Sequence, residues 1–280
     1  MSKLLFFKYH GAGNDFVLLD FTQFLPSFDF SNLARDLCDR RRGIGADGLL
    51  LLFPSTIADF RMRIFNADGS EPSMCGNGIR CLAKHILSRN PQLNEVFIET
   101  LHAVLRCRRH EEGIAVNLGT PSVLHWQFQL DGAELFVVHT GVPHAVVFVD
   151  HLDEVEVERL GKHIRFHPYF SPNGVNVNFI ALKEDGKLAV RTYERGVEGE
   201  TLACGTGAAA AAFVATEVKN LSAPVSVLTR SSFDPGVIVY KPHMHFLFPK
   251  NETGACEIEM IGRAQEVFGG SIELEYFSGA

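Results

Sequence analysis

The chain contains the stretch Met74-Cys75-Gly76-Asn77-Gly78 and repeats its pattern as Ala203-Cys204-Gly205-Thr206-Gly207, so that the two cysteines lie 129 residues apart. Each stretch precedes a segment that we predict to be helical, at residues 79–88 and 208–218. Glycine lets the backbone approach a ligand closely, and the free N–H groups at a helix N-terminus attract an anion. Each turn therefore has the chemistry to hold a carboxylate beside a sulfur atom.

Other segments repeat at nearly the same interval, between 128 and 130 residues, and in the same order. The matched pairs are residues 13–20 with 143–150, 43–47 with 172–176, and 60–66 with 188–194. A series of matches in one order at one spacing is typical of an internal duplication. We therefore predict two similar halves, residues 1–118 and 119–264, with the C-terminal residues 265–280 returning to the first half.

Most other segments have the composition of strands bounded by turn residues. We expect strands at residues 95–101, 103–107, 135–140, 225–229, 237–240 and 272–276, and a helix at residues 32–41 with Ser31 as N-cap and Gly43 after its end. The expected fold class is α/β (α+β), in which each half is a mainly antiparallel sheet wrapped around a central helix.

The composition limits the classes of function. The 280 residues are 46% hydrophobic and 21% charged with a net charge of −7, the balance of a globular protein that binds neither nucleic acid nor membrane. The basic cluster Arg40-Arg41-Arg42 is explained by cations at a helix C-terminus. The first residues do not resemble a secretion signal, so we expect a cytoplasmic protein whose six cysteines are reduced.

The two cysteine turns favour acid–base chemistry at a carbon atom. The field of a helix N-terminus favours thiolate over thiol and lowers the pKa of a cysteine from its usual value of about 8.5. Two such sulfurs on opposite sides of one cleft would invert a stereocentre, because one removes the α-proton and the other returns a proton to the opposite face. We therefore predict a racemase or epimerase that acts on a small amino acid and needs no cofactor and no metal.

Competing interpretations leave part of the pattern unexplained. Each turn taken alone could be a glycine-rich cap around a buried cysteine. A metal site at Cys75, Cys81 and His85 lacks the usual ligand spacing, and a cysteine hydrolase would use only one of the two thiols. No phosphate loop, dinucleotide motif or distinct pyridoxal-phosphate lysine motif is visible. We interpret Cys38, Cys107 and Cys256, which lack the glycine turn, as structural.

Three motifs resemble those of the diaminopimelate epimerase family. They are His10-Gly11-Ala12-Gly13-Asn14-Asp15-Phe16, residues 66–71 leading to Met74-Cys75-Gly76-Asn77-Gly78-Ile79-Arg80-Cys81, and residues 193–196 followed by Glu200-Thr201-Leu202-Ala203-Cys204-Gly205-Thr206-Gly207. The resemblance implies two pseudosymmetric halves with the active site in the cleft between them, no cofactor, and a homodimer. It also implies conversion of LL-diaminopimelate to the meso form, in lysine and cell-wall peptide synthesis.

The resemblance assigns roles by motif position. Cys75 and Cys204 are the acid and base thiols, and His144 and Glu194 are polar groups near them. The reacting carboxylate is held by Gly76, Asn77, Gly205 and Thr206. The remaining substrate contacts are Asn14, Asn66, Asn176, Glu194 and Arg195. Taken without the motifs, His144 would be an ordinary core or surface histidine, Asn66 and Asn176 turn residues, and Glu194-Arg195 a solvated strand end.

The chain departs from the family pattern at three places. Val142 stands where the family usually has Asn, Gly48 stands where many members have Gln, and the segment Gly196-Val197-Glu198-Gly199-Glu200 is one residue longer than usual. We expect these changes to affect how the far end of the substrate is bound, and not the reaction. The alternatives are a racemase of glutamate, proline or hydroxyproline and, from another class, a non-catalytic amino-acid-binding or thiol redox-sensing protein.

Overall fold

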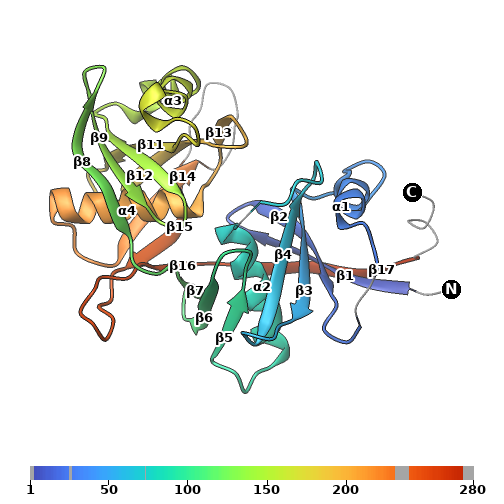
Figure 1. Ribbon diagram of the computed structural model, residues 1–280. Helices are drawn as coiled ribbons and strands as arrows, with labels where there is room; N and C mark the ends of the chain where they lie inside the picture. Colours follow the sequence, from blue (N-terminus) through green and yellow to red (C-terminus); the bar gives the residue numbers. More distant parts are fainter. Residues whose placement is uncertain (1–2, 25–26, 73, 231–239, 274–280) are drawn as a thin grey trace. The chain divides into compact units, whose positions relative to one another are not determined.

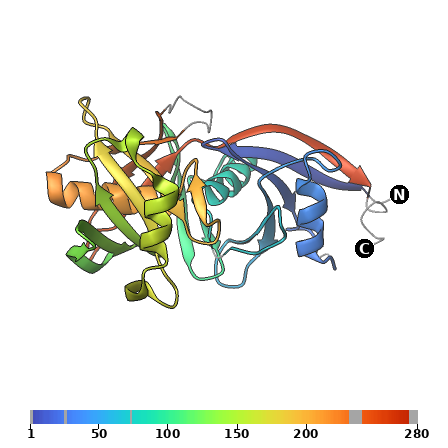
Figure 2. The ribbon, with the colours of Figure 1, turned by 90° about the horizontal axis from the view of Figure 1, so that it is seen from above.

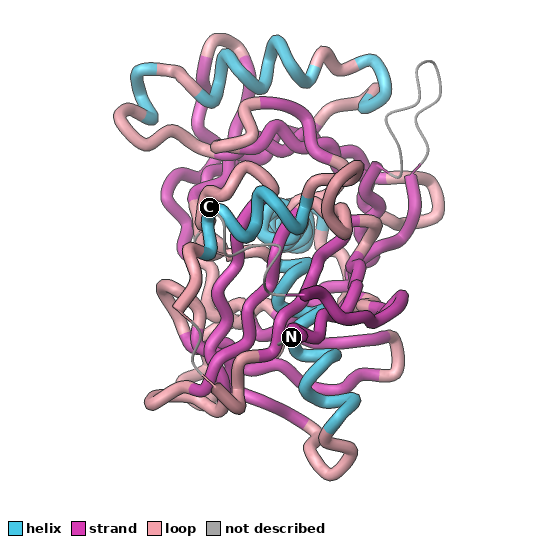
Figure 3. The backbone as a smooth tube through the Cα atoms, turned by 90° about the vertical axis from the view of Figure 1, so that its right-hand side faces the viewer, coloured by secondary structure: helices cyan, strands magenta, loops and turns pink. Residues whose placement is uncertain are grey.

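The computed structural model describes residues 3–24, 27–72, 74–230 and 240–273. The chain divides into two compact units, of which unit 1 comprises Met1–Val116 with Gly262–Ala280 and unit 2 comprises Asn117–Ile261. Strands form most of the regular structure in both units (Figure 3). None of the helices in the described ranges is both long enough and apolar enough to cross a membrane.

Within the described residues, unit 1 contains two helices and eight strands. Its elements are β1 (Lys3–Gly11), β2 (Asn14–Asp20), α1 (Phe30–Cys38), β3 (Gly48–Pro54), β4 (Phe60–Asn66), α2 (Gly76–Arg89), β5 (Glu95–Glu99), β6 (Val104–His110), β7 (Gly113–Asn117) and β17 (Gln265–Glu273). Strand β17 comes from the C-terminal part of the chain and lies antiparallel beside β1 (Figure 2).

Unit 2 follows the same plan. Its elements are β8 (Ser122–Leu130), β9 (Ala133–His139), β10 (Pro143–Phe148), the 3-10 turn η1 (Leu152–Glu154), α3 (Val157–Arg165), the 3-10 turn η2 (Pro168–Phe170), β11 (Asn176–Leu182), β12 (Leu188–Glu194), β13 (Gly199–Thr201), α4 (Gly205–Lys219), β14 (Val225–Arg230), β15 (Tyr240–Leu247) and β16 (Glu259–Gly262).

The two sheets have matching topology. The strand order β17-β1-β2-β3-β4-β5-β6 in unit 1 corresponds to β8-β9-β10-β11-β12-β14-β15 in unit 2. In each series the third and fourth strands, and the fifth and sixth, pair in parallel, whereas the other neighbours pair antiparallel. The predicted class is therefore confirmed: two similar halves, each built on a mainly antiparallel sheet.

Each sheet has one helix on each face (Figure 1). Helix α2 contacts β1–β6 and β17, and α4 contacts β9–β12, β14 and β15, so these are the predicted central helices. Helix α1 packs on β2–β4, and α3 on β11–β13. Because both faces are covered, β3 reads as a continuous apolar run in which Leu49, Leu50, Leu51 and Leu52 are all buried.

Small side chains let the central helix of unit 2 lie close to its strands. Helix α4 contains five consecutive alanines at positions 208–212, and all five are buried. Alanine also has the highest intrinsic helix propensity, so the run favours the helix while it keeps the helix surface smooth. The N-terminal part of this helix, which begins directly after Cys204, therefore packs closely on the sheet.

The structure corrects several predicted boundaries. The first helix begins and ends earlier than residues 32–41, since Asp29 is its N-cap and accepts hydrogen bonds from the N–H groups of Ser31 and Asn32. At its other end, Asp39 accepts from the N–H groups after it and turns the chain. Helices α2 and α4 also begin earlier than predicted, so that each cysteine is itself the N-cap. Of the predicted strands, residues 237–239 and 274–276 lie outside the described residues.

Candidate active site

Cys204 is placed by the way α4 begins. It is the N-cap of the helix, its side chain is buried, and its Sγ lies 3.6 Å from the hydroxyl oxygen of Thr206. The following turn has no room for a side chain at Gly207, where a Cβ would lie 2.3 Å from Oδ1 of Asn178 and 3.3 Å from the sulfur. Glycine at this position therefore allows the helix N-terminus to approach β11.

His144 lies behind the Cys204 turn as a fully buried side chain. Its Nε2 is 3.0 Å from the Thr206 hydroxyl, and its Nδ1 is 3.1 Å from Nδ2 of Asn178. Burial, together with electrostatic repulsion from His139 and Arg195, lowers the pKa of His144 to about 3. His144 is therefore a neutral imidazole at physiological pH, and it acts here through hydrogen bonds.

The other unit 2 residues predicted for the site gather where β11 begins and β12 ends. Asn176 accepts from the backbone N–H of Arg195 at 2.8 Å and donates to the carbonyl of Pro143 at 3.2 Å. Arg195 donates through Nη1 to the carbonyl of Asn173 at 3.4 Å. Burial raises the pKa of Glu194. An amide, a guanidinium and a carboxyl group are thus placed on adjacent strands.

Cys75 occupies the corresponding place in unit 1, as the N-cap of α2. Its Sγ accepts a hydrogen bond from the N–H of Gly78 at 3.4 Å and lies 3.8 Å from Oδ1 of Asn14. Asn77 donates to the same oxygen of Asn14 at 3.3 Å, and Arg80 donates to Oδ1 of Asn77 at 2.6 Å. The predicted residues Asn14, Cys75 and Asn77 are therefore brought together.

Ion pairs hold Asn14 in place. Its Nδ2 donates to Asp47 at 2.8 Å, and Arg40 bridges Asp47 and Asp15 at 2.8 Å and 2.7 Å. Burial tends to raise the pKa of Asp15, but hydrogen bonds from Arg40 and Lys8 outweigh it and hold that pKa well below its usual range. Arg40 therefore has a specific role in this arrangement, beyond that of a cation near a helix end.

The described hydrogen bonds do not join Asn66 to either cysteine. Its side chain donates to the hydroxyl of Ser70 at 2.9 Å, and its backbone N–H donates to the carbonyl of Ser70 at 2.8 Å. These bonds close the turn that follows β4. Asn66 is exposed, so its amide also faces solvent.

Three polar residues next to the cysteine turns were not predicted from the sequence. They are Arg80, which is fully buried beside Asn77, and the pair Asn178 and Thr192 behind His144. Burial lowers the pKa of Arg80. The sequence contained one indication of Asn178: side chains alternate along a strand, so Asn176 and Asn178, two residues apart, must share a face of β11.

The remaining cysteines differ from this pair in their surroundings. Burial raises the pKa of Cys38 to about 12, and it raises the pKa values of Cys81, Cys107 and Cys256 as well. These four thiols therefore remain protonated at neutral pH and are poor candidates for bases. In the part of the chain that the structure describes, no cluster of His, Cys, Asp and Glu side chains has the arrangement of a metal site.

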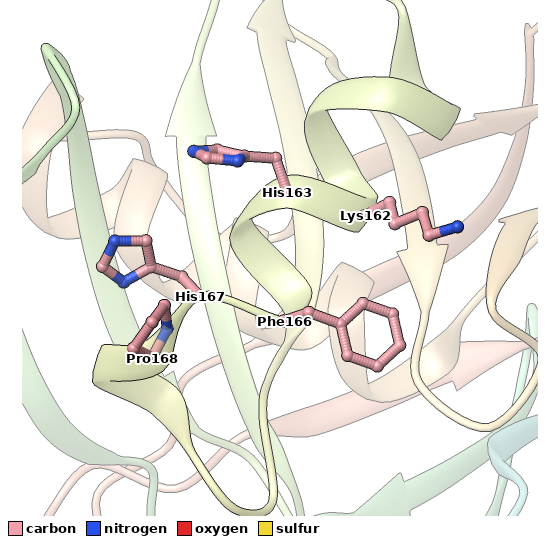
Figure 4. Close-up of a pocket in the computed structure, with 5 residues that line it drawn as sticks. All are labelled: Lys162, His163, Phe166, His167 and Pro168. Carbon is pink, nitrogen blue, oxygen red and sulfur yellow. The ribbon is translucent and has the colours of Figure 1, made fainter.

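A hollow of about 440 Å³ opens at the end of α3, away from the cysteine turns within unit 2. Figure 4 shows its lining, which consists of Lys162, His163, Phe166, His167 and Pro168. Apart from the lysine, the lining consists of the two histidine imidazoles and the apolar rings of Phe166 and Pro168. The hollow contains no residue of the two cysteine clusters, so we place the candidate active site at the clusters.

Comparison with known proteins identifies the family. The sequence profile described as "Diaminopimelate epimerase" matches residues 6–124 and 136–232. The chain belongs to the diaminopimelate epimerase family. A diaminopimelate epimerase of Methanothrix thermoacetophila is 44% identical over 82% of this chain and 87% of its own length, and one of Carboxydothermus hydrogenoformans is 38% identical over 97% and 99%. The chain is therefore an epimerase, and the resemblance seen in its motifs is confirmed.

Solved structures show that the fold of this diaminopimelate epimerase family member is shared more widely. A phenazine biosynthesis protein of the PhzF family from Bacillus anthracis has a TM-score of 0.71 at 19% identity, over 98% of this chain and all of that one. A hydroxyproline epimerase from Agrobacterium vitis has a TM-score of 0.64 at 17% identity, over 96% and 92%. At these identities the likeness concerns the fold alone.

The raised pKa of Glu194 predicts a pH-dependent stability difference. The folded protein binds the proton of this carboxyl group more tightly than the unfolded chain does, so the group's contribution is fully present below its ordinary pKa of 4.5 and is lost as the pH rises through its folded-state pKa. We expect Glu194→Gln, which cannot ionise, to gain stability over the wild type between pH 4 and pH 7. Urea unfolding at both pH values measures this, and a difference that stays constant with pH would contradict it.

Proposed function

We propose that this chain epimerises LL-diaminopimelate to meso-diaminopimelate by moving protons between the α-carbon and the thiols of Cys75 and Cys204. One observation supports the residue assignment above the others: both cysteines are N-caps of the central helices, at corresponding places in two duplicated units. The family relatives are diaminopimelate epimerases at up to 44% identity over most of the chain, which supports the substrate.

The chemistry requires one thiolate and one thiol at opposite faces of the reacting carbon. The thiolate removes the α-proton, the bond electrons move into the carboxylate, and the opposite thiol then gives its proton to the other face. The negative charge that develops on the carboxylate is favoured by backbone N–H groups at a helix N-terminus. Gly76, Asn77, Gly205 and Thr206 are the residues that would supply these groups.

The far end of diaminopimelate has its own ammonium and carboxylate. Arg195 has the planar guanidinium that suits a carboxylate, and Glu194 can accept from an ammonium group. Asn14, Asn66 and Asn176 offer amides that can donate or accept. We assign these residues to substrate binding, and we assign His144 and Glu194 to the tuning of the thiols.

Removal of either thiol should stop the reaction. We expect Cys75→Ala and Cys204→Ala each to lower the rate of epimerisation at least about a hundredfold, the usual size of a lost acid or base. Conversion of LL-diaminopimelate by reduced enzyme is the measurement, with Cys256→Ala as the control because that partly buried thiol lies outside both turns. A variant of Cys75 or Cys204 with nearly wild-type turnover would refute the two-base assignment.

Val142 predicts weaker binding of the far end of the substrate than an asparagine would give. Its backbone carbonyl accepts from the N–H of Thr140 at 3.2 Å, and its aliphatic side chain offers no hydrogen bond. We expect Val142→Asn to lower KM for diaminopimelate about two- to tenfold, the value of one added neutral hydrogen bond. The wild type should accordingly racemise L-glutamate slowly.

The matched assay follows glutamate and diaminopimelate in deuterium oxide with wild type and Val142→Asn in parallel. We expect wild-type enzyme to deuterate the α-carbon of glutamate slowly, and we expect the rate of this deuteration to be lower with Val142→Asn. The idea is wrong if wild-type enzyme leaves glutamate unlabelled while it turns over diaminopimelate, or if the variant has the same KM as wild type.

We further propose that the protein is a homodimer that associates through β17. Within the described part of unit 1 the printed register pairs this strand with β1, and β17 exposes Val267 and Phe268 while β1 exposes Leu5 opposite Ser271. An exposed edge strand with apolar side chains is a surface that pairs readily with a second chain. Sedimentation should show a dimer for wild type and a monomer for Val267→Asp, and a monomeric wild type at micromolar concentration would exclude this proposal.

We propose that the protein is located in the reducing environment of the cytoplasm, because its cysteines are present as free thiols. All six cysteines are free, and both proposed bases must remain unoxidised to exchange protons. Fractionation of cells that produce the protein tests the location, and recovery outside the cytoplasm would contradict it.

A further inference from the structure

A chain of buried polar groups runs from Asn178 through His144 and Thr206 to Cys204. The successive distances are 3.1 Å from Asn178 Nδ2 to His144 Nδ1, 3.0 Å from His144 Nε2 to Thr206 Oγ1, and 3.6 Å from Thr206 Oγ1 to Cys204 Sγ. Asn178 and His144 are fully buried. All four residues belong to unit 2.

The direction of the hydrogen bonds in this chain is set at Asn178. Its Nδ2 also lies 3.2 Å from the carbonyl oxygen of Ala145, which can only accept, and its Oδ1 accepts from the hydroxyl of Thr192 at 3.0 Å. The amide nitrogen, and not the oxygen, must therefore face Ala145 and His144. It follows that Nδ1 of His144 accepts, so that the imidazole proton lies on Nε2.

The directions of the other two hydrogen bonds, from His144 to Thr206 and from Thr206 to Cys204, follow from the number of protons that each group carries. The Nε2–H of His144 donates to the oxygen of Thr206, which directs the single hydroxyl proton of Thr206 toward another acceptor. The sulfur of Cys204 lies at hydrogen-bond distance for that proton. A hydrogen bond donated to sulfur stabilises the thiolate more than the thiol.

We propose that Asn178 is a positioning residue for Cys204, because it fixes the tautomer of His144 and thereby makes the Thr206 hydroxyl a donor to the sulfur. This inference rests on the proposed function for the importance of the Cys204 thiolate. It adds a residue that touches neither the sulfur nor the substrate, and it explains why the imidazole is held neutral behind the turn.

Unit 1 shows that the fold does not need this amide. Asn178 pairs with Thr192 across β11 and β12, and Leu50 pairs with Ile64 across β3 and β4. A Cβ at Gly207 would meet Asn178, as one at Gly78 would meet Leu50 and Ile64. The same place beneath the helix N-terminus is thus apolar in one unit and polar in the other.

The tautomer of His144 gives the first test and needs no change at Asn178. The protein has 12 histidines, so imidazole-¹⁵N labelling with a His144→Gln sample for assignment isolates the signal of this residue. We expect the wild type to show Nε2 protonated and Nδ1 unprotonated at neutral pH. The opposite tautomer, or a charged imidazole, would overturn the proposal whatever the enzyme catalyses.

The reactivity of Cys204 gives the second test. In a Cys75→Ser background, iodoacetamide labelling of the Cys204 peptide is followed by mass spectrometry from pH 5 to pH 10. We expect Asn178→Leu, which copies the residue of unit 1, to shift the profile to higher pH and lower the rate at pH 7 about tenfold, the lower end for a hydrogen bond to a charged atom. Thr140→Val is the matched control.

The control removes a different, partly buried hydrogen bond to Thr206, since the Thr140 hydroxyl donates to the backbone carbonyl of Thr206 at 2.8 Å. Its labelling profile should stay at the wild-type position. Equal shifts in both variants would indicate general loosening of the turn and overturn the proposal, as would no shift in Asn178→Leu. Because labelling needs no turnover, these outcomes do not depend on the substrate, which the epimerisation assays test separately.

Discussion

The structure depends on one constraint that occurs twice: a central helix must begin with cysteine as its N-cap, close against the sheet. Gly207 permits this in unit 2, because any Cβ there would collide with Asn178, and Gly78 permits it in unit 1, where a Cβ would lie 2.9 Å from Leu50. The free N–H groups of each helix then face the same space as the sulfur. The proposed reactive thiol and the proposed anion site thus rest on one backbone feature.

Duplication supplied two such turns, and the polar side chains around them have diverged. Around Cys75 the neighbours are amides held by charged groups, since Asn14 is fixed by Asp47 and Asn77 by Arg80. Around Cys204 the neighbours are a hydroxyl and a neutral imidazole. An epimerase needs two sulfurs in opposite protonation states, and unlike surroundings are one way to keep two similar turns in different states.

The sequence predicted the fold class and the position of both cysteines at helix starts because both follow from local patterns. The repeat spacing, the glycines after each cysteine and the apolar periodicity are visible in one dimension. The first helix was misplaced since Asp29 competes with Ser31 as N-cap, and short-range signals do not decide between them. Asn178 and Arg80 were not predicted because a sequence pattern does not record their burial or their partners across the sheet or along the helix.

The central claim is that two thiols exchange protons with opposite faces of one carbon, and the isotope content at early conversion tests it most directly. Reduced enzyme is given LL-diaminopimelate in deuterium oxide, and both isomers are recovered before the reverse reaction contributes. The account predicts one deuterium at the inverted α-carbon of the meso product and none in the remaining LL substrate, because the removed proton stays on one sulfur while the other delivers solvent deuterium. A meso product that retains the original proton would show that a single base acts on both faces and would contradict the account.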